Sequence, residues 1–424
     1  MVKFKYYLAL LLILLSLPEI MAQESKPTLT IEACYDLARQ NYPLIKQKAL
    51  ISKTREYSFA NVATGHLPQV SFNGQASYQS DVTQIPIKLS NQEIPTLSKD
   101  QYRVTGEVNQ VLYDGGLRKS QEALLDVTAS VENQKVEVEL YKIKERINQL
   151  FFSALLIEEQ LEQSELLQKD ILSGIYKVRA AVANGTALKS SVNVLQAELL
   201  KVNQRRIELT STRESYLNIL SLFINKEIPE NTLLEKPQEK TIIRSINRPE
   251  LKLYNLQQQG LESHDNLRMA KNRPRVGLFW QGGYGRPGLN LLNNSFDFFY
   301  IGGIRLNWTL ADWYTDRNDR KLLTINRQAI VVQQETFLFN TNLALKGQIS
   351  EVTKLLSLID SDKEIIALRE TIKNTAKAQL ENGVITSHDY LTEVNAEDQA
   401  RQTFLMHQVQ LLLAQYTYQT TSGN

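Results

Sequence analysis

The chain has 424 residues, of which 48 are Lys or Arg and 46 are Asp or Glu, with a formal net charge of +2 at pH 7. A charge this close to zero gives no electrostatic reason to expect nucleic acid as a partner. The single cysteine, Cys34, excludes an internal disulfide framework and a zinc site built on cysteines.

The N-terminus is expected to be a secretory signal peptide over residues 1–22. Lys3 and Lys5 precede an apolar run over 6–17, and the segment ends at the small residue Ala22. The run has 12 residues, fewer than the roughly 20 that a helix needs to cross a bilayer. No later stretch is long and apolar enough for a membrane-spanning helix, so we expect export without a helical anchor.

Two very long helices are expected, because proline is missing from two long parts of the chain. None occurs over 96–228 or after Pro287, and a proline inside a helix costs about 3 kcal/mol. The segments 117–183 and 317–381 are the candidates. At about 1.5 Å per residue, each helix would be about 100 Å long, which is typical of coiled-coil assemblies rather than of compact domains.

Apolar residues follow two faces of the helix expected over 117–183. The sets are Leu124, Val127, Val131, Val138 and Tyr141 on one face, and Val136, Leu140, Ile143, Ile147, Leu150 and Ala154 on the other. Two apolar stripes indicate a helix packed on two sides, as in a bundle or a closed ring of helices. An ordinary dimeric coiled coil is the alternative interpretation.

The second half of the sequence repeats motifs of the first half. Asn41-Tyr-Pro43 matches Asn247-Arg-Pro249, Pro68-Gln-Val70 matches Pro274-Arg-Val276, and Asn184-Gly185 matches Asn382-Gly383. Internal similarity at a nearly constant spacing indicates a duplicated structural unit. We expect a first repeat over 23–222, a linker or equatorial segment over 223–246, and a second repeat over 247–424. Each repeat reads as a helix, two strands, a long helix, an Asn-Gly turn and a returning helix.

Four segments in which apolar and polar residues alternate predict β-strands, at 70–79, 102–109, 276–284 and 300–309. Strands of about ten residues with aromatic ends are typical of an outer-membrane β-barrel. The residues expected to face lipid are Val70, Phe72, Tyr78, Val104, Val108, Val276, Leu278, Trp280, Tyr284, Ile304, Leu306 and Trp308. A soluble sheet with one wet face is the alternative, but the signal peptide favours the membrane.

Four strands cannot close into a barrel on their own. In lipid, each unpaired backbone group at an open edge costs several kcal/mol, and bacterial barrels need about eight strands or more. The chain is therefore expected to oligomerise, with two copies giving eight strands and three copies giving twelve. The long helices are expected to form a second, helical barrel continuous with the first, so that the assembly encloses a tunnel.

The motifs that would indicate an enzyme have simpler interpretations. Gly283-Tyr-Gly285-Arg-Pro-Gly288 is a G-x-G-x-x-G sequence, but it does not open a helix and is expected at the end of a hairpin. Asp312, Asp316 and Asp319 match no calcium loop and are expected to cap a helix. The four histidines form no metal-binding pattern. We therefore expect no enzymatic activity and no cofactor or metal.

Each long helix is expected to end at an Asn-Gly turn, where glycine in the left-handed conformation stops a helix. The turns lie at 184–185 and 382–383, and they are expected to form the tip of the molecule farthest from the strands. An axial partner would meet them there. The residues expected to dock such a partner are Asn184, Gly185, Thr186, Leu188, Asn382, Gly383, Val384 and Thr386.

Taken together, these motifs resemble the TolC-type outer-membrane efflux family, also called outer-membrane factors. The resemblance covers nearly all of the mature chain and includes the Asn-x-Pro start of each repeat, Leu67-Pro68-Gln69-Val70, Leu112-Tyr-Asp114-Gly-Gly116 and the Asn-Gly tips. It implies a mainly α fold with a membrane β portion, as a homotrimer. A 12-stranded outer-membrane barrel, four strands per chain, would continue into a periplasmic α-helical coiled-coil barrel.

The resemblance also implies a function and partners. The trimer would reside in the bacterial outer membrane and extend into the periplasm. It would serve as the passive exit duct of a tripartite efflux pump or a type I secretion system. Its tips would dock onto a periplasmic adaptor, or membrane fusion protein, that is coupled to an inner-membrane transporter.

A pore constriction is the last expectation from the resemblance. In the family, carboxylates on the returning helix of the second hairpin narrow the periplasmic entrance, and Asp389 falls at such a position. Three copies would form an acidic ring that favours cations. Thr392, Ile385 and Leu380 replace polar or acidic residues that can hold the closed state. An ordinary solvated Asp389 is the alternative, and a secreted coiled-coil scaffold or adhesin is the alternative for the whole chain.

Overall fold

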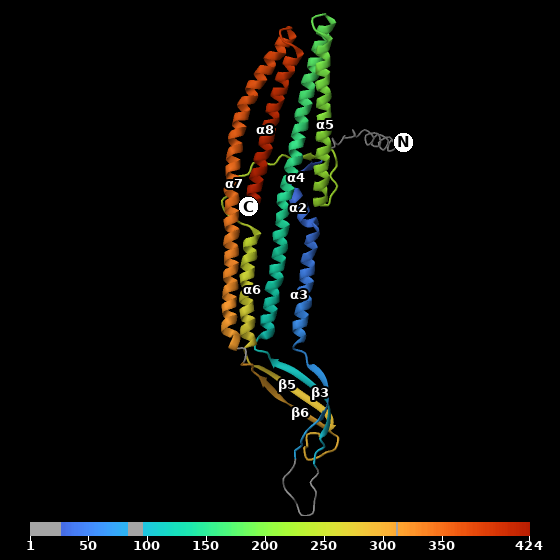
Figure 1. The fold of residues 1–424 in the computed structure, drawn as a ribbon, viewed down its shortest axis with the longest axis vertical. Helices are drawn as coiled ribbons and strands as arrows, with labels where there is room; N and C mark the ends of the chain where they lie inside the picture. The colour runs from blue at the N-terminus through green and yellow to red at the C-terminus, as the bar shows by residue number, and fades with distance from the viewer. Residues whose placement is uncertain (1–26, 84–95, 311–312) are drawn as a thin grey trace, which may run out of the picture. The chain divides into compact units, whose positions relative to one another are not determined.

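The structure is a computed structural model that describes residues 27–83, 96–310 and 313–424 (Figure 1). The signal peptide expected over 1–22 and the capping residue Asp312 lie outside the described residues. The contacts of the chain define two units. The hairpin unit comprises the described residues up to Ala38 together with Ile147–Glu239 and Ile359–Leu412, and the sheet unit comprises Arg39–Arg146, Lys240–Leu358 and Leu413–Asn424.

The elements follow one another in an order that occurs nearly twice. The first part contains β1 (Thr28–Leu29), α2 (Ile31–Asn41), η1 (Pro43–Ile45), α3 (Lys46–Thr64), β2 (Gln69–Tyr78), β3 (Asp100–Tyr113), α4 (Leu117–Ala183) and α5 (Lys189–Ile224). The second contains β4 (Leu233–Leu234), α6 (Pro249–Lys271), β5 (Arg275–Arg286), β6 (Asp297–Asn307), α7 (Trp313–Glu381) and α8 (Ser387–Ser422). Each unit takes segments from both parts.

The two long helices are confirmed. Helix α4 has 67 residues and the predicted bounds, whereas α7 has 69 residues and begins four residues earlier than predicted. Helix α4 starts where Asp114 accepts hydrogen bonds from the backbone N–H groups of Gly116, at 2.9 Å, and Arg118, at 2.8 Å. Among the described residues, no helix combines the length and the apolar character needed to cross a bilayer.

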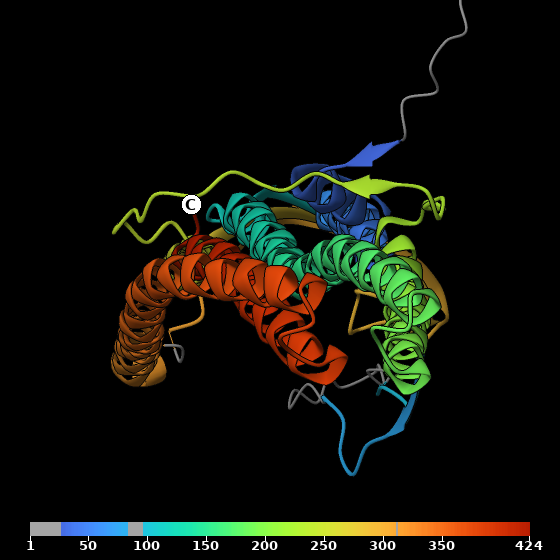
Figure 2. The same cartoon turned by 90° about the horizontal axis from the view of Figure 1, so that it is seen from above.

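The hairpin unit packs α5 against α4 and α8 against α7, and Figure 2 shows the two hairpins side by side. Residues from both hairpins form one core, which consists of Leu167, Ile171, Ile175, Val178, Leu195, Val202, Ala376, Tyr390, Leu391 and Val394. The second apolar stripe predicted for α4 is buried, apart from Leu150, which is half-buried. The first stripe is half-buried except at Val138. Of these stripe residues only Ile147, Leu150 and Ala154 belong to the hairpin unit, and the others lie in the part of α4 that belongs to the sheet unit. One face of α4 is thus buried and the other half-buried, which confirms the two-sided packing predicted for this helix.

The sheet unit contains one antiparallel sheet of four strands in the order β2-β3-β5-β6. The register places Val70 opposite Val108, and Val108 opposite Trp280. Because side chains alternate across a strand, this register gathers the apolar residues on one face. We call it the apolar face, made of Val70, Phe72, Tyr78, Tyr102, Val104, Val108, Val276, Leu278, Trp280, Tyr284, Phe298, Tyr300, Ile304 and Leu306.

The opposite face of the sheet is mostly polar, and we call it the polar face. It is made of Ser71, Asn73, Gln75, Ser77, Arg103, Thr105, Glu107, Asn109, Arg275, Phe279, Gln281, Asp297, Phe299, Ile301, Arg305 and Asn307. The alternation read from the sequence is thus confirmed in all four strands. The boundaries differ from the predicted ones by one to four residues in every strand. In particular, β6 ends at Asn307, one residue before Trp308, whose indole N–H donates to the carbonyl oxygen of Asn272 at 3.1 Å.

The predicted linker over 223–246 contains a short strand that the sequence did not indicate. Strand β4 pairs in parallel with β1, as Figure 2 shows, so the start of the described chain is bound to the segment between the two halves. The backbone N–H of Leu233 donates to the carbonyl oxygen of Pro27 at 2.9 Å. Two-residue strands carry little periodicity, which is why the pairing was missed.

Candidate functional site

The two Asn-Gly tips have the same backbone geometry. Gly185 has a φ of 72° and Gly383 a φ of 71°, in the left-handed region that favours glycine. The next backbone N–H, of Thr186 or Val384, donates to a carbonyl oxygen five residues earlier at 2.9 Å in both tips. This hydrogen bond closes the end of the helix. The turns predicted at the ends of α4 and α7 are therefore confirmed.

All the residues predicted to dock a partner lie exposed at these two turns. A Cβ added to either glycine would meet no atom within 4 Å. Each turn also presents a large apolar side chain to solvent, with Leu188 74% and Val384 69% exposed. The two tips thus offer open backbone and exposed apolar surface, which a partner protein can cover.

Asp389 caps helix α8. Its carboxylate accepts a hydrogen bond from the backbone N–H of Thr386 at 3.0 Å and from the hydroxyl of Thr386 at 2.7 Å. The backbone N–H of Asp389 donates in return to the Thr386 hydroxyl at 3.3 Å. This reciprocal arrangement is a capping box. The carboxylate is exposed, and the Thr386 hydrogen bonds hold the pKa of Asp389 below its usual value.

Asp389→Ala is expected to loosen the second tip and leave the first unchanged. The N-cap residue of helix α5, Leu188, makes no side-chain capping hydrogen bond, so the first tip is an internal control. The backbone amides at the start of α8 should exchange with deuterium several-fold faster in the variant, measured by mass spectrometry on the full chain.

Low pH should weaken the capping contact between Asp389 and Thr386 in the wild-type chain. Because the folded-state pKa of Asp389 lies below 3.8, its value without the contact, the capping contact contributes its full stability above that pH. The contribution is lost as the pH falls through the lowered pKa. If neither the substitution nor acid speeds up exchange at the start of α8 more than at the start of α5, Asp389 does not have this capping role.

Below the tips, the two hairpins approach each other closely. A Cβ added to Gly174 of α4 would lie 3.2 Å from the ring of Tyr390 on α8 and 3.8 Å from Leu195 on α5. Tyr390 is 2% exposed, and burial, followed by the charges of Asp170 and Glu381, raises the pKa of its hydroxyl to about 12. The hydroxyl therefore stays neutral, and the glycine makes room for its ring between the hairpins.

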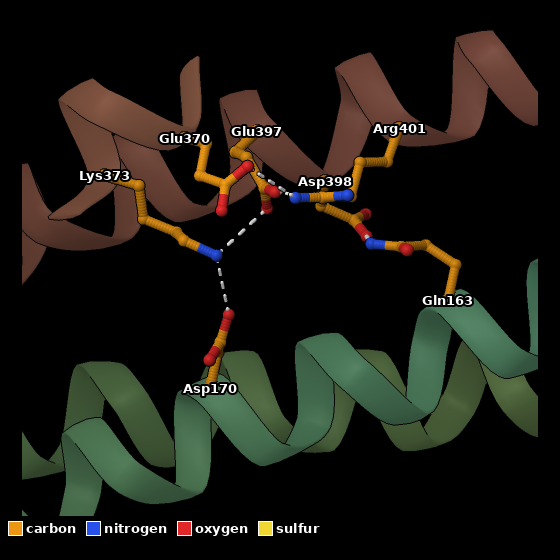
Figure 3. Close-up of polar contacts among 7 residues, drawn as sticks. All are labelled: Gln163, Asp170, Glu370, Lys373, Glu397, Asp398 and Arg401. Carbon is orange, nitrogen blue, oxygen red and sulfur yellow. Dashed lines mark hydrogen bonds and ion pairs between the residues drawn. The ribbon is translucent and has the colours of Figure 1, made fainter. Parts of the chain in front are cut away.

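A polar network joins the hairpins beside this core (Figure 3). Lys373 of α7 lies between two carboxylates, with its Nζ 3.0 Å from Asp170 of α4 and 3.3 Å from Glu397 of α8. Burial alone would lower the pKa of Lys373, but the hydrogen bond and charge of Asp170, and then those of Glu397, raise it above its usual value. The ammonium group is thus charged, and through it α7 is bound to two other helices, α4 and α8.

Arg401 continues the network along α8. Its Nε binds the carboxylate of Glu397, and a terminal nitrogen lies 3.3 Å from Glu370. The side chain of Glu397 is only 4% exposed, so two cations compensate one buried carboxylate. Such compensation is needed because an unpaired buried charge is strongly destabilising.

Asp398, the neighbour of Glu397, faces helix α4. It accepts a hydrogen bond from the side-chain amide of Gln163 at 3.0 Å and another from Gln402. Burial raises the pKa of Asp398, and the hydrogen bond from Gln163 and the charge of Arg205 offset this only in part. The contact from α4 to α8 therefore lies in a buried environment.

The sequence did not predict this network. Asp170 and Lys373 are 203 residues apart, and helical periodicity identifies buried faces without identifying partners. One signal was present, because Glu397 follows Tyr390 and Val394 at helical spacing on the buried stripe of α8. An acid on an apolar stripe indicates a buried charge that requires a cation.

The other motifs have structural roles in the described residues. Gly283 and Gly285 lie within β5 and pair with its neighbours, as expected for a hairpin. Asp316, in the first turn of α7, binds Arg268 and lies 3.0 Å from Arg320, while Asp319 accepts a hydrogen bond from Thr315 at 2.9 Å. No group of three or more potential metal-binding side chains occurs in the part of the chain that the structure describes.

Comparisons with known proteins identify the fold. No protein-family model matches the chain, and no curated protein does so by sequence. The outer membrane protein VceC of Vibrio cholerae has a similar structure, with a TM-score of 0.63 and 13% sequence identity, over 93% of this chain and 96% of that one. The Campylobacter jejuni CmeC outer membrane channel gives a TM-score of 0.62 and 13% identity, over 93% and 85%.

A third structure is the open state of the Neisseria gonorrhoeae MtrE outer membrane channel, with a TM-score of 0.62 and 14% identity. It is matched over 93% of this chain and 89% of that one. The likeness extends over 85–96% of the length of these three structures. The chain therefore shares their fold, at a sequence identity of only 13–14%.

Proposed function

We propose that this chain, which has the TolC-type outer-membrane factor fold, is the outer-membrane exit duct of a tripartite efflux pump or a type I secretion system. Substrates pass through it from a periplasmic adaptor and an inner-membrane transporter to the outside. The duct performs no chemistry and takes no cofactor, since the transporter supplies the energy. The observation that carries the proposal is a sheet with an exposed apolar face in a chain whose long hairpins end in open tips.

The apolar face supports a location in the outer membrane. Phe72 is 82% and Phe298 86% exposed, although water solvates neither ring well. An apolar face of this kind on antiparallel strands is typical of a lipid-facing barrel wall. The lipid-facing residues predicted from the sequence are proposed to have that role, with the helices extending into the periplasm.

The edges of the sheet support a homotrimer. Strands β2, with 10 residues, and β6, with 11, each have one neighbour in the described sheet. In lipid their free backbone groups would each cost several kcal/mol, so neighbouring copies must pair with them. Three copies give a 12-stranded barrel, and the long helices form a coiled-coil barrel. The 320 Å³ groove along Leu124, Val127 and Val131, beside α6 and α7, can take side chains of a neighbouring helix.

The lengths of the helices support the two sequence repeats over 23–222 and 247–424, with the linker over 223–246. The outgoing helices α4 and α7 have 67 and 69 residues, and the returning helices α5 and α8 have 36 each. Both outgoing helices end at an Asn-Gly turn with nearly the same φ. Duplication of one unit explains this match.

The tips are proposed to dock the periplasmic adaptor, and Asp389 to line the entrance. An exposed aspartate is ionised at neutral pH, and the Thr386 hydrogen bonds, which lower the pKa of Asp389, favour the ionised form further. In a trimer it would be present three times around the axis, and a ring of carboxylates favours the passage of cations. The capping box fixes the carboxylate next to the tip, which suits a constriction at that level.

Cysteine cross-linking across the sheet edges tests the assembly. Phe72→Cys in β2 is combined in turn with Tyr300→Cys, Gly302→Cys or Ile304→Cys in β6, all on the apolar face. At least one pair is expected to give disulfide-linked dimers and trimers in denaturing gels, since a disulfide requires Cα atoms within about 7 Å. The natural thiol, Cys34, is buried, so the background should be low.

Single-cysteine variants are the controls, and membrane fractionation accompanies the gels. The duct would be contradicted if every double-cysteine variant ran as a monomer on the gels and the mature chain stayed in solution without detergent. That outcome would favour the alternative of a secreted coiled-coil scaffold or adhesin with a small soluble sheet.

A further inference from the structure

Two phenylalanine rings lie among the hydrophilic side chains of the polar face. Phe279 of β5 covers Gly303 on the neighbouring strand, where an added Cβ would come within 3.2 Å of the ring. Phe299 of β6 covers Gly283 in the same way, at 2.7 Å. Each glycine lets a ring lie against the backbone of the next strand. The rings are thus fixed on a surface that is otherwise mostly polar.

The guanidinium group of an arginine lies over each of these rings. The Cζ atom of Arg305 lies 4.4 Å from the centre of the Phe279 ring, and that of Arg103 lies 5.5 Å from the centre of the Phe299 ring. Both distances are within the range of cation–π attraction. The polar face therefore presents two similar stacks of glycine, aromatic ring and arginine.

The two stacks differ in their charge. Arg305 lies 3.3 Å from the carboxylate of Glu107, so its charge is compensated. Over residues 27–83, 96–310 and 313–424, no carboxylate lies within ion-pair distance of Arg103, and the residue is exposed. The face carries three arginines, with Arg275 as the third, against the two acids Glu107 and Asp297. Arg103 thus joins a fixed ring to an uncompensated positive charge.

We propose that Arg103 and Phe299 form a contact site on the inner wall of the duct for organic anions that carry a flat apolar ring. The guanidinium fork matches a carboxylate or sulfonate group. Phe299 is half-buried, and the part of its ring that stays accessible beside Arg103 supplies apolar surface for the remainder of the molecule. Because stacking already holds the guanidinium in place, binding costs less conformational entropy. The inference rests on the proposed function, since the polar face lines a lumen only in a closed barrel.

Ion conductance tests the site with a defined probe. The purified full-length protein is placed in a planar bilayer in KCl, and 1-naphthalenesulfonate is added as the blocking anion. The probe is expected to reduce the current at lower concentration than methanesulfonate, which has the charge without the ring. Arg103→Gln should raise the concentration for half-block about tenfold, the order expected for loss of a hydrogen bond to a charged group.

Two further variants separate the parts of the site. Phe299→Leu should remove the preference for the naphthalene ring while anions still block better than cations. The double variant Glu107→Gln, Arg305→Gln is the matched control, because it breaks the other stack without changing the net charge of the face. The half-block concentration of this control should stay within about twofold of the wild-type value, since a compensated charge contributes little.

The outcomes distinguish this inference from the function on which it rests. A wild-type protein without any conductance would overturn the duct itself, and the site with it. A conducting wild-type channel whose block is the same in Arg103→Gln would overturn only the site. Equal loss of block in Arg103→Gln and in the double control would also overturn it, because the effect would then belong to the whole face.

Discussion

Replacing Gly185 and Gly383 together with valine is expected to abolish export while the protein still assembles in the membrane. Both glycines have a φ near +70°, which a β-branched residue adopts only with strain, at a cost of about 1–2 kcal/mol per position. The change alters the tips, where the proposed adaptor docks. Because neither position has an atom within 4 Å of an added Cβ, the packing of the hairpins should be unaffected.

Export is measured as the ability of each variant to restore function to a strain that lacks the gene, and assembly by the cross-linking of β2 to β6. Asparagine at both positions is the matched control, because it tolerates the left-handed conformation while adding a side chain. If only the backbone conformation of the tips matters, the asparagine variant should export normally. If the partner packs directly on the glycines, neither the valine nor the asparagine variant should export. Unchanged export in the valine variant would show that the tips carry no docking.

Glu397→Ala is expected to destabilise the hairpin unit by about 3 kcal/mol, the scale for removing one partner of a buried charge pair. The substitution leaves Lys373 with Asp170 as its remaining carboxylate and Arg401 with Glu370. It also removes a side chain that is almost fully buried. The free energy of opening is read from the deuterium exchange of α7 and α8 in the full-length protein.

The matched control is Asp360→Ala on α7. Asp360 pairs with Lys363 at 3.1 Å, but the two side chains are 78% and 59% exposed. Removing this exposed pair should therefore destabilise the hairpin unit by less than about 1 kcal/mol. Glu397→Gln keeps the shape of the side chain and removes its charge. The stability lost in this variant should lie between the losses in Glu397→Ala and Asp360→Ala. Similar effects of Glu397→Ala and Asp360→Ala would refute the view that the network holds the hairpins together.

Local features of the sequence were enough to predict most of the fold. The absence of proline and the Asn-Gly pairs set the length and the ends of α4 and α7, because both act on the backbone of neighbouring residues. Alternation placed Val70, Trp280 and Leu306 on one face of the sheet, since side chains point alternately to its two sides. These signals lie within a few residues of the features that they predict.

Contacts between distant segments could not be predicted in this way. The ion pair of Lys373 with Asp170, the pairing of β1 with β4 and the stack of Arg103 on Phe299 each join residues that are far apart in the chain. Periodicity shows which face of a helix or strand is covered, but it does not name the partner. The capping contact of Asp389 with Thr386 is different, because these residues are three apart and Thr386-Ser-His-Asp389 is a local capping-box pattern that the sequence analysis did not use.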